Sequence, residues 1–346
     1  MVFRNEVARI VIPIIFILLI IGASFYKKKI ETTLSDKNLM IVRTIVGIIC
    51  LIIIIWTLVT IFFLMPNKSN IEETTSENSY VRKSKNWHED YMEYETLHRK
   101  TKGKSQVIAL IDSGISDFQK PKVDVSYNVA NNSNDLDENG HGTMMCSLIL
   151  GADNLLGIAP KAKVYSYKVV DETGKVEPEI LSAAIDNAIK DDVTIINISL
   201  GSYFDNEKIK KSINNAIKSG IIVVASSGDY ETDDMLYPAK YEDCISVGAI
   251  DNKLDVWEGT NAINQCDILA PGVNVYTMLN TGDLAPTTGT SQSTALISGY
   301  IALIKDYGIN CGIDLNVKDV KEILKNINDN KMTYSEGLNS VKEYVK

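Results

Sequence analysis

Two long apolar runs dominate the first 65 residues of the chain. The run from Thr44 to Met65 contains 22 residues and no charged side chain, and the run from Ile10 to Ser24 contains 15. A helix needs about 20 apolar residues to cross the hydrocarbon core of a bilayer. The longer run therefore predicts a transmembrane helix, and the shorter run is a candidate for a second one.

Basic residues decide how the two runs are arranged. Two of them precede the first run and five lie between the runs: Arg4 and Arg9, then Lys27, Lys28, Lys29, Lys37 and Arg43. Short basic loops stay in the cytoplasm. We therefore predict that residues 1–66 form a transmembrane hairpin in contact with membrane lipid, with a cytoplasmic loop. The rest of this multi-pass cell-membrane protein would be extracytoplasmic. A secretory signal peptide is the alternative for the first run, because residues 22–24 (Gly-Ala-Ser) follow it.

The next segment is polar. Residues 67–104 are rich in Glu, Ser, Thr and Lys, and apolar spacing appears only from Trp87 onward. This composition predicts a tether followed by a short helix. We place the start of the folded domain, residues 105–346, directly after it.

Short apolar runs alternate with helical patterns in this domain. Five runs read as strands: Val107–Ile111, Lys163–Val170, Val193–Ser199, Ile221–Ala225 and Ile245–Ala249. Apolar residues recur at helical spacing in two intervening segments, residues 181–189 and 209–217. Strands that alternate with helices imply a mainly parallel sheet covered on both faces. We predict an α/β fold of three layers.

Charge and cysteine content narrow the function. The formal net charge is −9, which argues against a nucleic-acid partner, because phosphate binding requires a basic surface. None of the five cysteines forms a Cys-x-x-Cys pair, so no zinc site is predicted, and no cofactor is expected. The acidic clusters at 135–138 and 231–234 are interpreted as solvated loops and not as calcium sites.

Three side-chain types suggest acyl transfer. This chemistry needs a hydroxyl nucleophile, a base and a carboxylate that orients the base. His141 is the one histidine of three that lies outside the tether segment, and a buried helical pattern follows it. Asp112 ends the first predicted strand, and Ser291 precedes an apolar helical pattern. A serine at a helix N-terminus has N–H groups nearby that can stabilise developing negative charge.

Three blocks around these residues resemble the signatures of the subtilisin-like serine proteases, the peptidase S8 family, in the same chain order. They are Ile111-Asp-Ser-Gly-Ile115, Asn139-Gly-His-Gly-Thr143 and Gly289-Thr-Ser-Gln-Ser293. Four further segments also resemble family blocks: residues 156–160, 198–201, 237–239 and 269–272. The resemblance implies a subtilisin-like fold and an endopeptidase acting on peptides or proteins. Ser291 would be the nucleophile, His141 the general base and Asp112 the residue that orients the imidazole.

The resemblance also implies where the substrate binds. Ser199, Leu200 and Gly201 would pair with an extended substrate backbone, and Ser227 and Gly228 would contribute to the same site. Two readings of specificity remain. Leu236 stands where the family often has glycine at the floor of the first specificity pocket, which predicts a shallow pocket. The acidic residues at 231–234 would instead favour a basic side chain.

The oxyanion loop departs from the family pattern. The family usually has Gly-Asn where this chain has Gly228 and Asp229. An ionised Asp229 cannot donate to an oxyanion, and loss of one donor lowers turnover about 10²- to 10³-fold. Asp229 could donate if it is protonated, or the N–H of Ser291 could act alone. Asp229, together with the altered residues Gln292, Ser293 and Ala295, also keeps open a second function, a weak or inactive subtilisin-fold binding or sensor protein.

Overall fold

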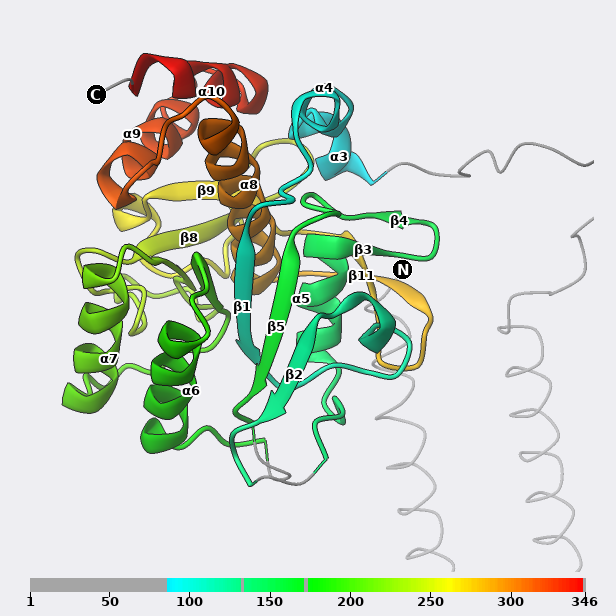
Figure 1. Ribbon diagram of the computed structural model, residues 1–346, viewed down its shortest axis with the longest axis vertical. Helices are drawn as coiled ribbons and strands as arrows, with labels where there is room; N and C mark the ends of the chain where they lie inside the picture. The colour runs from blue at the N-terminus through cyan, green and yellow to red at the C-terminus, as the bar shows by residue number, and fades with distance from the viewer. Residues whose placement is uncertain (1–85, 132–133, 171–173, 345–346) are drawn as a thin grey trace, which may run out of the picture. The chain divides into compact units, whose positions relative to one another are not determined.

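The computed structural model describes residues 86–131, 134–170 and 174–344 (Figure 1). The two predicted transmembrane helices and most of the predicted tether lie outside these residues. Within the described part of the chain, no helix is both long and apolar enough to cross a bilayer.

A parallel sheet of seven strands is the centre of the described fold, in the order β2-β5-β1-β6-β7-β8-β9. The strands are β1 (Val107–Asp112), β2 (Val125–Asn128), β5 (Lys163–Lys168), β6 (Ile195–Ile198), β7 (Ile222–Ser226), β8 (Ile245–Ile250) and β9 (Ile268–Pro271). β6, β7 and β8 are buried along their whole length. Their continuous apolar sequences therefore reflect a sheet that is covered on both faces.

Alternate residues of each strand enter two separate cores. Ile108 and Leu110 of β1 pack with helices α5 (His141–Leu150) and α8 (Thr290–Asn310) on one face. Ala109 and Ile111 pack with α6 (Pro178–Lys190) and α7 (Glu207–Lys218) on the other. Figure 1 shows α6 and α7 together on one side of the sheet. The three-layer α/β architecture predicted from the sequence is confirmed.

Smaller elements complete the described domain. They are the β3 (Gly151–Ala152) and β4 (Leu155–Leu156) hairpin, the β10 (Val275–Met278) and β11 (Leu284–Thr287) hairpin, helices α9 (Val317–Asn328) and α10 (Tyr334–Ser340), and three 3-10 turns, η1 (Lys120–Lys122), η2 (Ile263–Gln265) and η3 (Val341–Tyr344). The predicted strands and helices between residues 107 and 250 are all present. β2, β9 and both hairpins were not predicted as strands.

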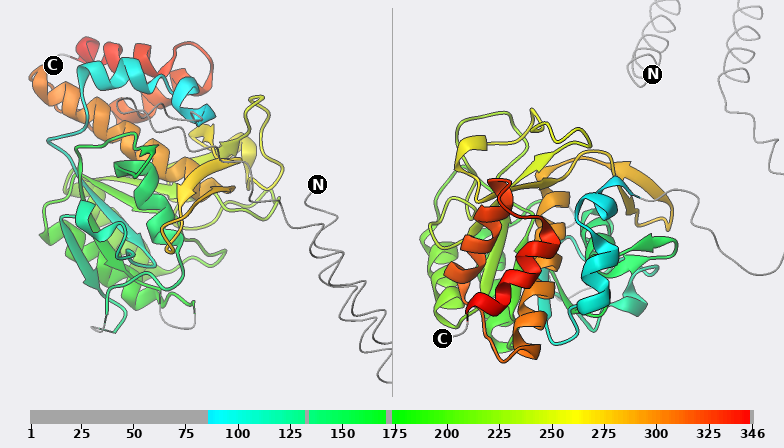
Figure 2. Two further views of the ribbon diagram at one scale, coloured as in Figure 1. Left: turned by 90° about the vertical axis from the view of Figure 1, so that its right-hand side faces the viewer. Right: turned by 90° about the horizontal axis from the view of Figure 1, so that it is seen from above.

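Two short helices precede the sheet, α3 (Trp87–Tyr91) and α4 (Tyr94–Lys100). Met92, Tyr94 and Leu97 from this segment are buried in the same core as α5 and α8. The Glu93 carboxylate accepts hydrogen bonds from the Ser335 N–H at 2.8 Å and from its hydroxyl at 2.9 Å. Figure 2 shows the two helices beside the C-terminal helices. Residues 86–104 are therefore part of the folded domain, and the boundary predicted at residue 105 lies too late.

Candidate active site

Three neighbouring strands end at one edge of the sheet and place the candidate residues there. Asp112 is the last residue of β1, Ser199 follows β6, and Asp229 lies three residues beyond β7. β6 pairs with β1 on one side and with β7 on the other. Helices α5 and α8, which begin at His141 and Thr290, pack against each other on the sheet. Residues far apart in the sequence are therefore assembled at the carboxyl ends of the strands, where open α/β sheets form their sites.

The Asp112 carboxylate and the His141 imidazole form a hydrogen-bonded pair. His141 Nδ1 lies 2.8 Å from Asp112 Oδ1 and 3.0 Å from Oδ2. The Asp112 side chain is 1% exposed, and its Oδ1 also accepts a hydrogen bond from the Ser113 N–H at 2.7 Å. With Nδ1–H donating to the carboxylate, Nε2 carries the free lone pair. This tautomer is the one that a general base requires.

Close backbone contact between β1 and α5 makes this pair possible. A Cβ atom on Gly142 would lie 2.3 Å from the Gly114 carbonyl oxygen. No real side chain fits at that distance, so only glycine lets the first turn of α5 approach the end of β1. Gly140, the residue before the helix, has a φ of 96°, a conformation that favours glycine.

Asp137 organises the same region, a role that was not predicted from the sequence. Its Oδ1 accepts hydrogen bonds from the Ser113 hydroxyl at 2.8 Å and the Gly140 N–H at 2.7 Å. Its Oδ2 accepts from the N–H and the hydroxyl of Thr143 at 2.8 and 2.6 Å. Asp137 is 5% exposed, so the prediction of a solvated acidic loop was wrong for this residue. A carboxylate three positions before a Gly-x-Gly-Thr turn at a helix start was the available signal, because such turns expose N–H groups.

Nearby charges raise the pKa of His141. Burial by itself would lower this pKa, but the charge of Asp112 and its hydrogen bond to the ring raise it, with further contributions from Asp137 and Asp229. The net effect is a pKa above the ordinary value of 6.5. The three carboxylates therefore stabilise the imidazolium that forms when His141 accepts a proton.

Ser291 lies in the first turn of α8, beside the end of β6. Its hydroxyl donates to the Ser199 carbonyl oxygen at 3.4 Å, and the Ser199 hydroxyl donates to the Ser291 carbonyl at the same distance. Among the described residues, no hydrogen bond joins Ser291 to His141. The hydroxyl of Ser293, one of the altered residues, donates to the carbonyls of Ala270 and Pro271 at 2.9 and 3.0 Å. The altered block therefore still begins a regular helix that is anchored on β9.

Asp229 is bound to the start of α8. Its Oδ1 accepts hydrogen bonds from the Thr290 N–H at 2.9 Å and from the Thr290 hydroxyl at 2.6 Å. Its Oδ2 faces Gly289, where an added Cβ would lie 2.7 Å away. The carboxylate thus binds the residue that precedes Ser291. It is also close enough to influence the pKa of His141. Within the described part of the chain, Oδ2 accepts no hydrogen bond.

The predicted substrate-binding residues differ in accessibility. Gly201 is exposed, Leu200 is half-buried and Ser199 is 7% exposed. Ser227 is fully buried, its N–H donates to Val247 and its carbonyl accepts from Leu236, both at 3.0 Å. Within the described residues, both backbone groups of Ser227 are therefore already hydrogen-bonded inside the domain.

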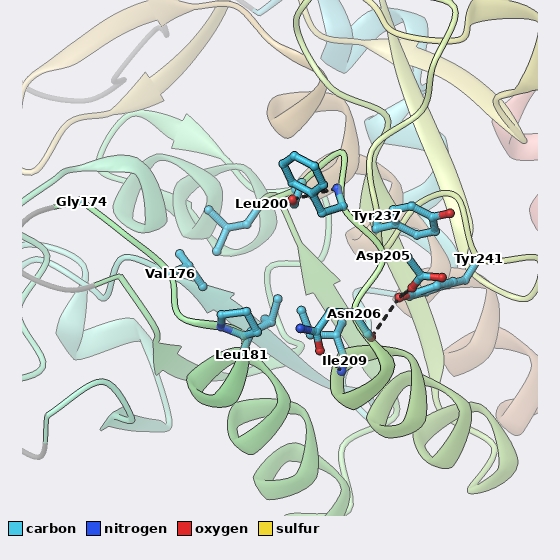
Figure 3. A pocket seen from close by; sticks show the side chains of 13 residues that line it. Gly174, Val176, Leu181, Leu200, Asp205, Asn206, Ile209, Tyr237 and Tyr241 are labelled. Carbon is cyan, nitrogen blue, oxygen red and sulfur yellow. Dashed lines mark hydrogen bonds between the residues drawn. The ribbon is translucent and has the colours of Figure 1, made fainter.

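A pocket of about 470 Å³ opens beside Leu200 (Figure 3). Val176 and Leu181 lie on one side of it, and Asp205 and Tyr241 lie opposite. The Tyr241 hydroxyl donates to Asp205 at 2.6 Å. The pocket therefore has apolar walls and one bound carboxylate, next to the chain segment predicted to pair with substrate.

In the described ranges, no group of three or more His, Cys, Asp or Glu side chains converges to hold a metal ion. Two acidic side chains of the predicted loops are in ion pairs: Asp135 with Lys120, and Asp234 with Lys240.

Comparison with known proteins agrees with this geometry. Residues 103–340 match the model of the subtilase family. The chain belongs to the subtilase family. It is 32% identical over 226 residues to the major intracellular serine protease of Bacillus subtilis, covering 60% of this chain and 70% of that protein. It is 33% identical over 213 residues to subtilisin E of the same organism, covering 58% of this chain and 56% of subtilisin E.

A third relative shows the same degree of identity over a smaller share of its length. The minor extracellular protease Epr of Bacillus subtilis is 32% identical over 232 residues, covering 66% of this chain and 36% of that protein. The relatives include proteins described as intracellular and as extracellular. Membership of the subtilase family makes this chain a serine-type endopeptidase by class.

Proposed function

We propose that this subtilase hydrolyses peptide bonds with Ser291 as nucleophile, His141 as general base and Asp112 as the residue that orients the imidazole. The observation that carries the proposal is the hydrogen bond of 2.8 Å between His141 Nδ1 and Asp112 Oδ1, at the carboxyl end of β1. Ser291 lies on the helix that packs against the helix of His141. Among the residues that the structure describes, its hydroxyl makes one long hydrogen bond of 3.4 Å. Rotation about the Cα–Cβ bond releases it from Ser199, and catalytic contacts of this kind commonly tighten only when substrate binds.

The reaction would proceed by an acyl-enzyme. The Ser291 oxygen bonds to the substrate carbonyl carbon while its proton passes to His141 Nε2. The carbon–nitrogen bond then breaks, and Nε2 returns the proton to the leaving amine. Water repeats the two steps and releases the acid. The Thr290 N–H is already bonded to Asp229, so the N–H of Ser291 would stabilise the oxyanion.

We propose further that residues 1–66 anchor the enzyme in the cell membrane, with the peptidase domain outside the cytoplasm. The support is the 22-residue uncharged run and the five basic residues that precede it. The anchored enzyme would act on peptides or proteins that approach the extracytoplasmic face of the cell membrane.

A second candidate function is a subtilisin-fold binding protein without useful turnover. Asp229 favours it, because a carboxylate beside Ser291 repels the oxyanion that hydrolysis must form. The hydroxyl of Ser291, bonded to Ser199 and not to His141, is compatible with the same reading.

Covalent labelling of the nucleophile separates the two functions. A fluorophosphonate probe reacts with a serine that is activated by a neighbouring base, so we expect it to label the wild-type protein and not Ser291→Ala. Ser293→Ala, two residues along the same helix, is the matched control and should retain the label. A folded wild-type protein that takes up no label, and cleaves no peptide, would contradict the endopeptidase.

A further inference from the structure

Leu236 fills the space between two glycines that flank the nucleophile. A Cβ atom on Gly201 would lie 2.8 Å from Leu236 Cβ and 2.9 Å from its Cδ1. A Cβ atom on Gly228 would lie 2.8 Å from Leu236 Cγ and, again, 2.9 Å from Cδ1. The same methyl group therefore touches the bare faces of both glycines. We call the space between Gly201 and Gly228 the glycine slot.

Both walls of the glycine slot are connected to the start of α8. Gly201 lies two residues after Ser199, whose carbonyl accepts the Ser291 hydroxyl. The N–H of Gly228 donates to the Thr290 hydroxyl at 3.4 Å. A substrate carbonyl carbon that bonds to Ser291 would therefore lie close to both walls. If the substrate backbone pairs with residues 199–201, the side chain on the acyl side of the scissile bond would be directed into the slot.

The Leu236 side chain is held in the slot by its own backbone. Its N–H donates to the Ser227 carbonyl at 3.0 Å. The next residue, Tyr237, exchanges two hydrogen bonds with Ser202, of 2.8 and 3.0 Å. These bonds tie the segment to both walls, and Leu236 is 5% exposed. A large substrate side chain would have to displace a packed leucine whose backbone segment is held by these hydrogen bonds.

We propose that Leu236 is the specificity-determining residue of this enzyme and that it restricts the acyl-side residue of the scissile bond to glycine or alanine. The inference rests on the proposed peptidase function. It contrasts with the pocket beside Leu200, which has room for a side chain further along the substrate (Figure 3). The enzyme would thus select a small residue at the cleaved bond and tolerate a larger one away from it.

Peptides that differ only in their last residue test the proposal. Four-residue fluorogenic amides of the form Ala-Ala-Ala-X, with X as Gly, Ala, Leu, Phe or Arg, would be assayed for kcat/KM with the full chain. A hydrophobic pocket discriminates about tenfold or more for each methylene it cannot accept. We expect the wild type to cleave X = Ala at least about tenfold faster than X = Leu, Phe or Arg. In Leu236→Gly, the ratio of kcat/KM for the X = Leu peptide to kcat/KM for the X = Ala peptide should rise by about tenfold.

The matched control removes a buried leucine elsewhere. Leu324→Ala lies on α9, where the side chain is fully buried, and should keep the wild-type ranking despite its loss of stability. Leu236→Ala replaces Leu236→Gly if the latter fails to fold, which near-ultraviolet circular dichroism would report. A wild type that prefers Leu, Phe or Arg overturns the inference, and so does a folded Leu236 variant with an unchanged ranking.

Labelling with fluorophosphonate keeps the two proposals distinguishable, because the probe has no amino-acid side chain. A wild type that is labelled but cleaves after large residues refutes the role of Leu236 alone. A wild type that is neither labelled nor active refutes the peptidase function, and the role of Leu236 with it.

Discussion

At the scale of residues, the carboxylate of Asp229 has two opposing effects on the proposed reaction. Its Oδ1 holds the start of α8 through Thr290, and its charge is one of those that raise the pKa of His141. The same charge opposes the oxyanion. The residue therefore favours proton acceptance by His141 and disfavours the intermediate that follows.

Asp229→Asn should lower the pKa of His141 and should also remove the repulsion of the oxyanion. The raised pKa of His141 keeps the imidazole protonated to higher pH, so kcat/KM should rise with pH through a value above 6.5. Removal of the negative charge lowers that pKa and shifts the acid limb to lower pH. The amide retains an acceptor for Thr290 and adds a donor for the oxyanion, so the plateau should rise about tenfold or more.

A pH profile of kcat/KM with a peptide ester or amide measures this prediction. Asp234→Asn is the control, because Asp234 is exposed and paired with Lys240, and it should leave the limb and the plateau unchanged. A lower plateau in Asp229→Asn would mean that the carboxylate assists catalysis.

At the scale of elements, the packing of α5 against the end of β1 positions the catalytic pair. Gly142 lets the helix approach Gly114, and Asp137 accepts four hydrogen bonds from the residues around both ends. These contacts hold the His141 ring against Asp112. The imidazole is therefore oriented by the backbone before any substrate arrives.

Gly142→Ala should separate the two elements. The added methyl group would lie 2.3 Å from the Gly114 oxygen, so the first turn of α5 must shift and take His141 with it. We expect the rate of fluorophosphonate labelling to fall about 10²-fold, since small misplacements of catalytic groups have effects of that size. Overpacking of this kind costs about 1–3 kcal/mol of unfolding free energy, which urea titration measures.

Asn214→Ala, on an exposed position of α7, is the matched helix substitution. It should change neither labelling nor stability. Normal labelling of Gly142→Ala would show that the approach of α5 to β1 is not needed to orient His141.

At the scale of the whole molecule, the first helices of the described domain pack against its last ones. α3 and α4 contribute Met92, Tyr94 and Leu97 to the core, and Glu93 binds Ser335 of α10. The start of the described domain is therefore packed against its C-terminal helix α10.

Cys311 provides a test of the proposed topology. It is an exposed free thiol, whereas burial raises the pKa of Cys146 and Cys244 to about 12 and that of Cys266 to about 11. Thiols with such values react slowly. A membrane-impermeant maleimide should therefore label Cys311 on intact cells, and Cys311→Ser should lose the label. Labelling that appears only after lysis would place the domain in the cytoplasm.

The apolar pattern by itself determined most of the sheet. Runs such as Ile221–Ala225 have no polar alternation, so they can only be stable with both faces covered, and the strands and helices between residues 107 and 250 followed. β2 was not predicted because its residues, Val125–Asn128, are half polar at the edge of the sheet. The packing of α3 and α4 was not predicted because the few apolar residues there gain their burial from distant helices.

The residue types of the candidate site were also available from the sequence, since Asp112, His141 and Ser291 lie in recognisable blocks. Only the tertiary structure decided their surroundings. The bond of Asp229 to Thr290, the buried role of Asp137 and the position of Leu236 between Gly201 and Gly228 all join segments that are separated along the chain. Sequence pattern reports local burial, whereas hydrogen-bond partners and filled space depend on which strand ends become neighbours in the folded sheet.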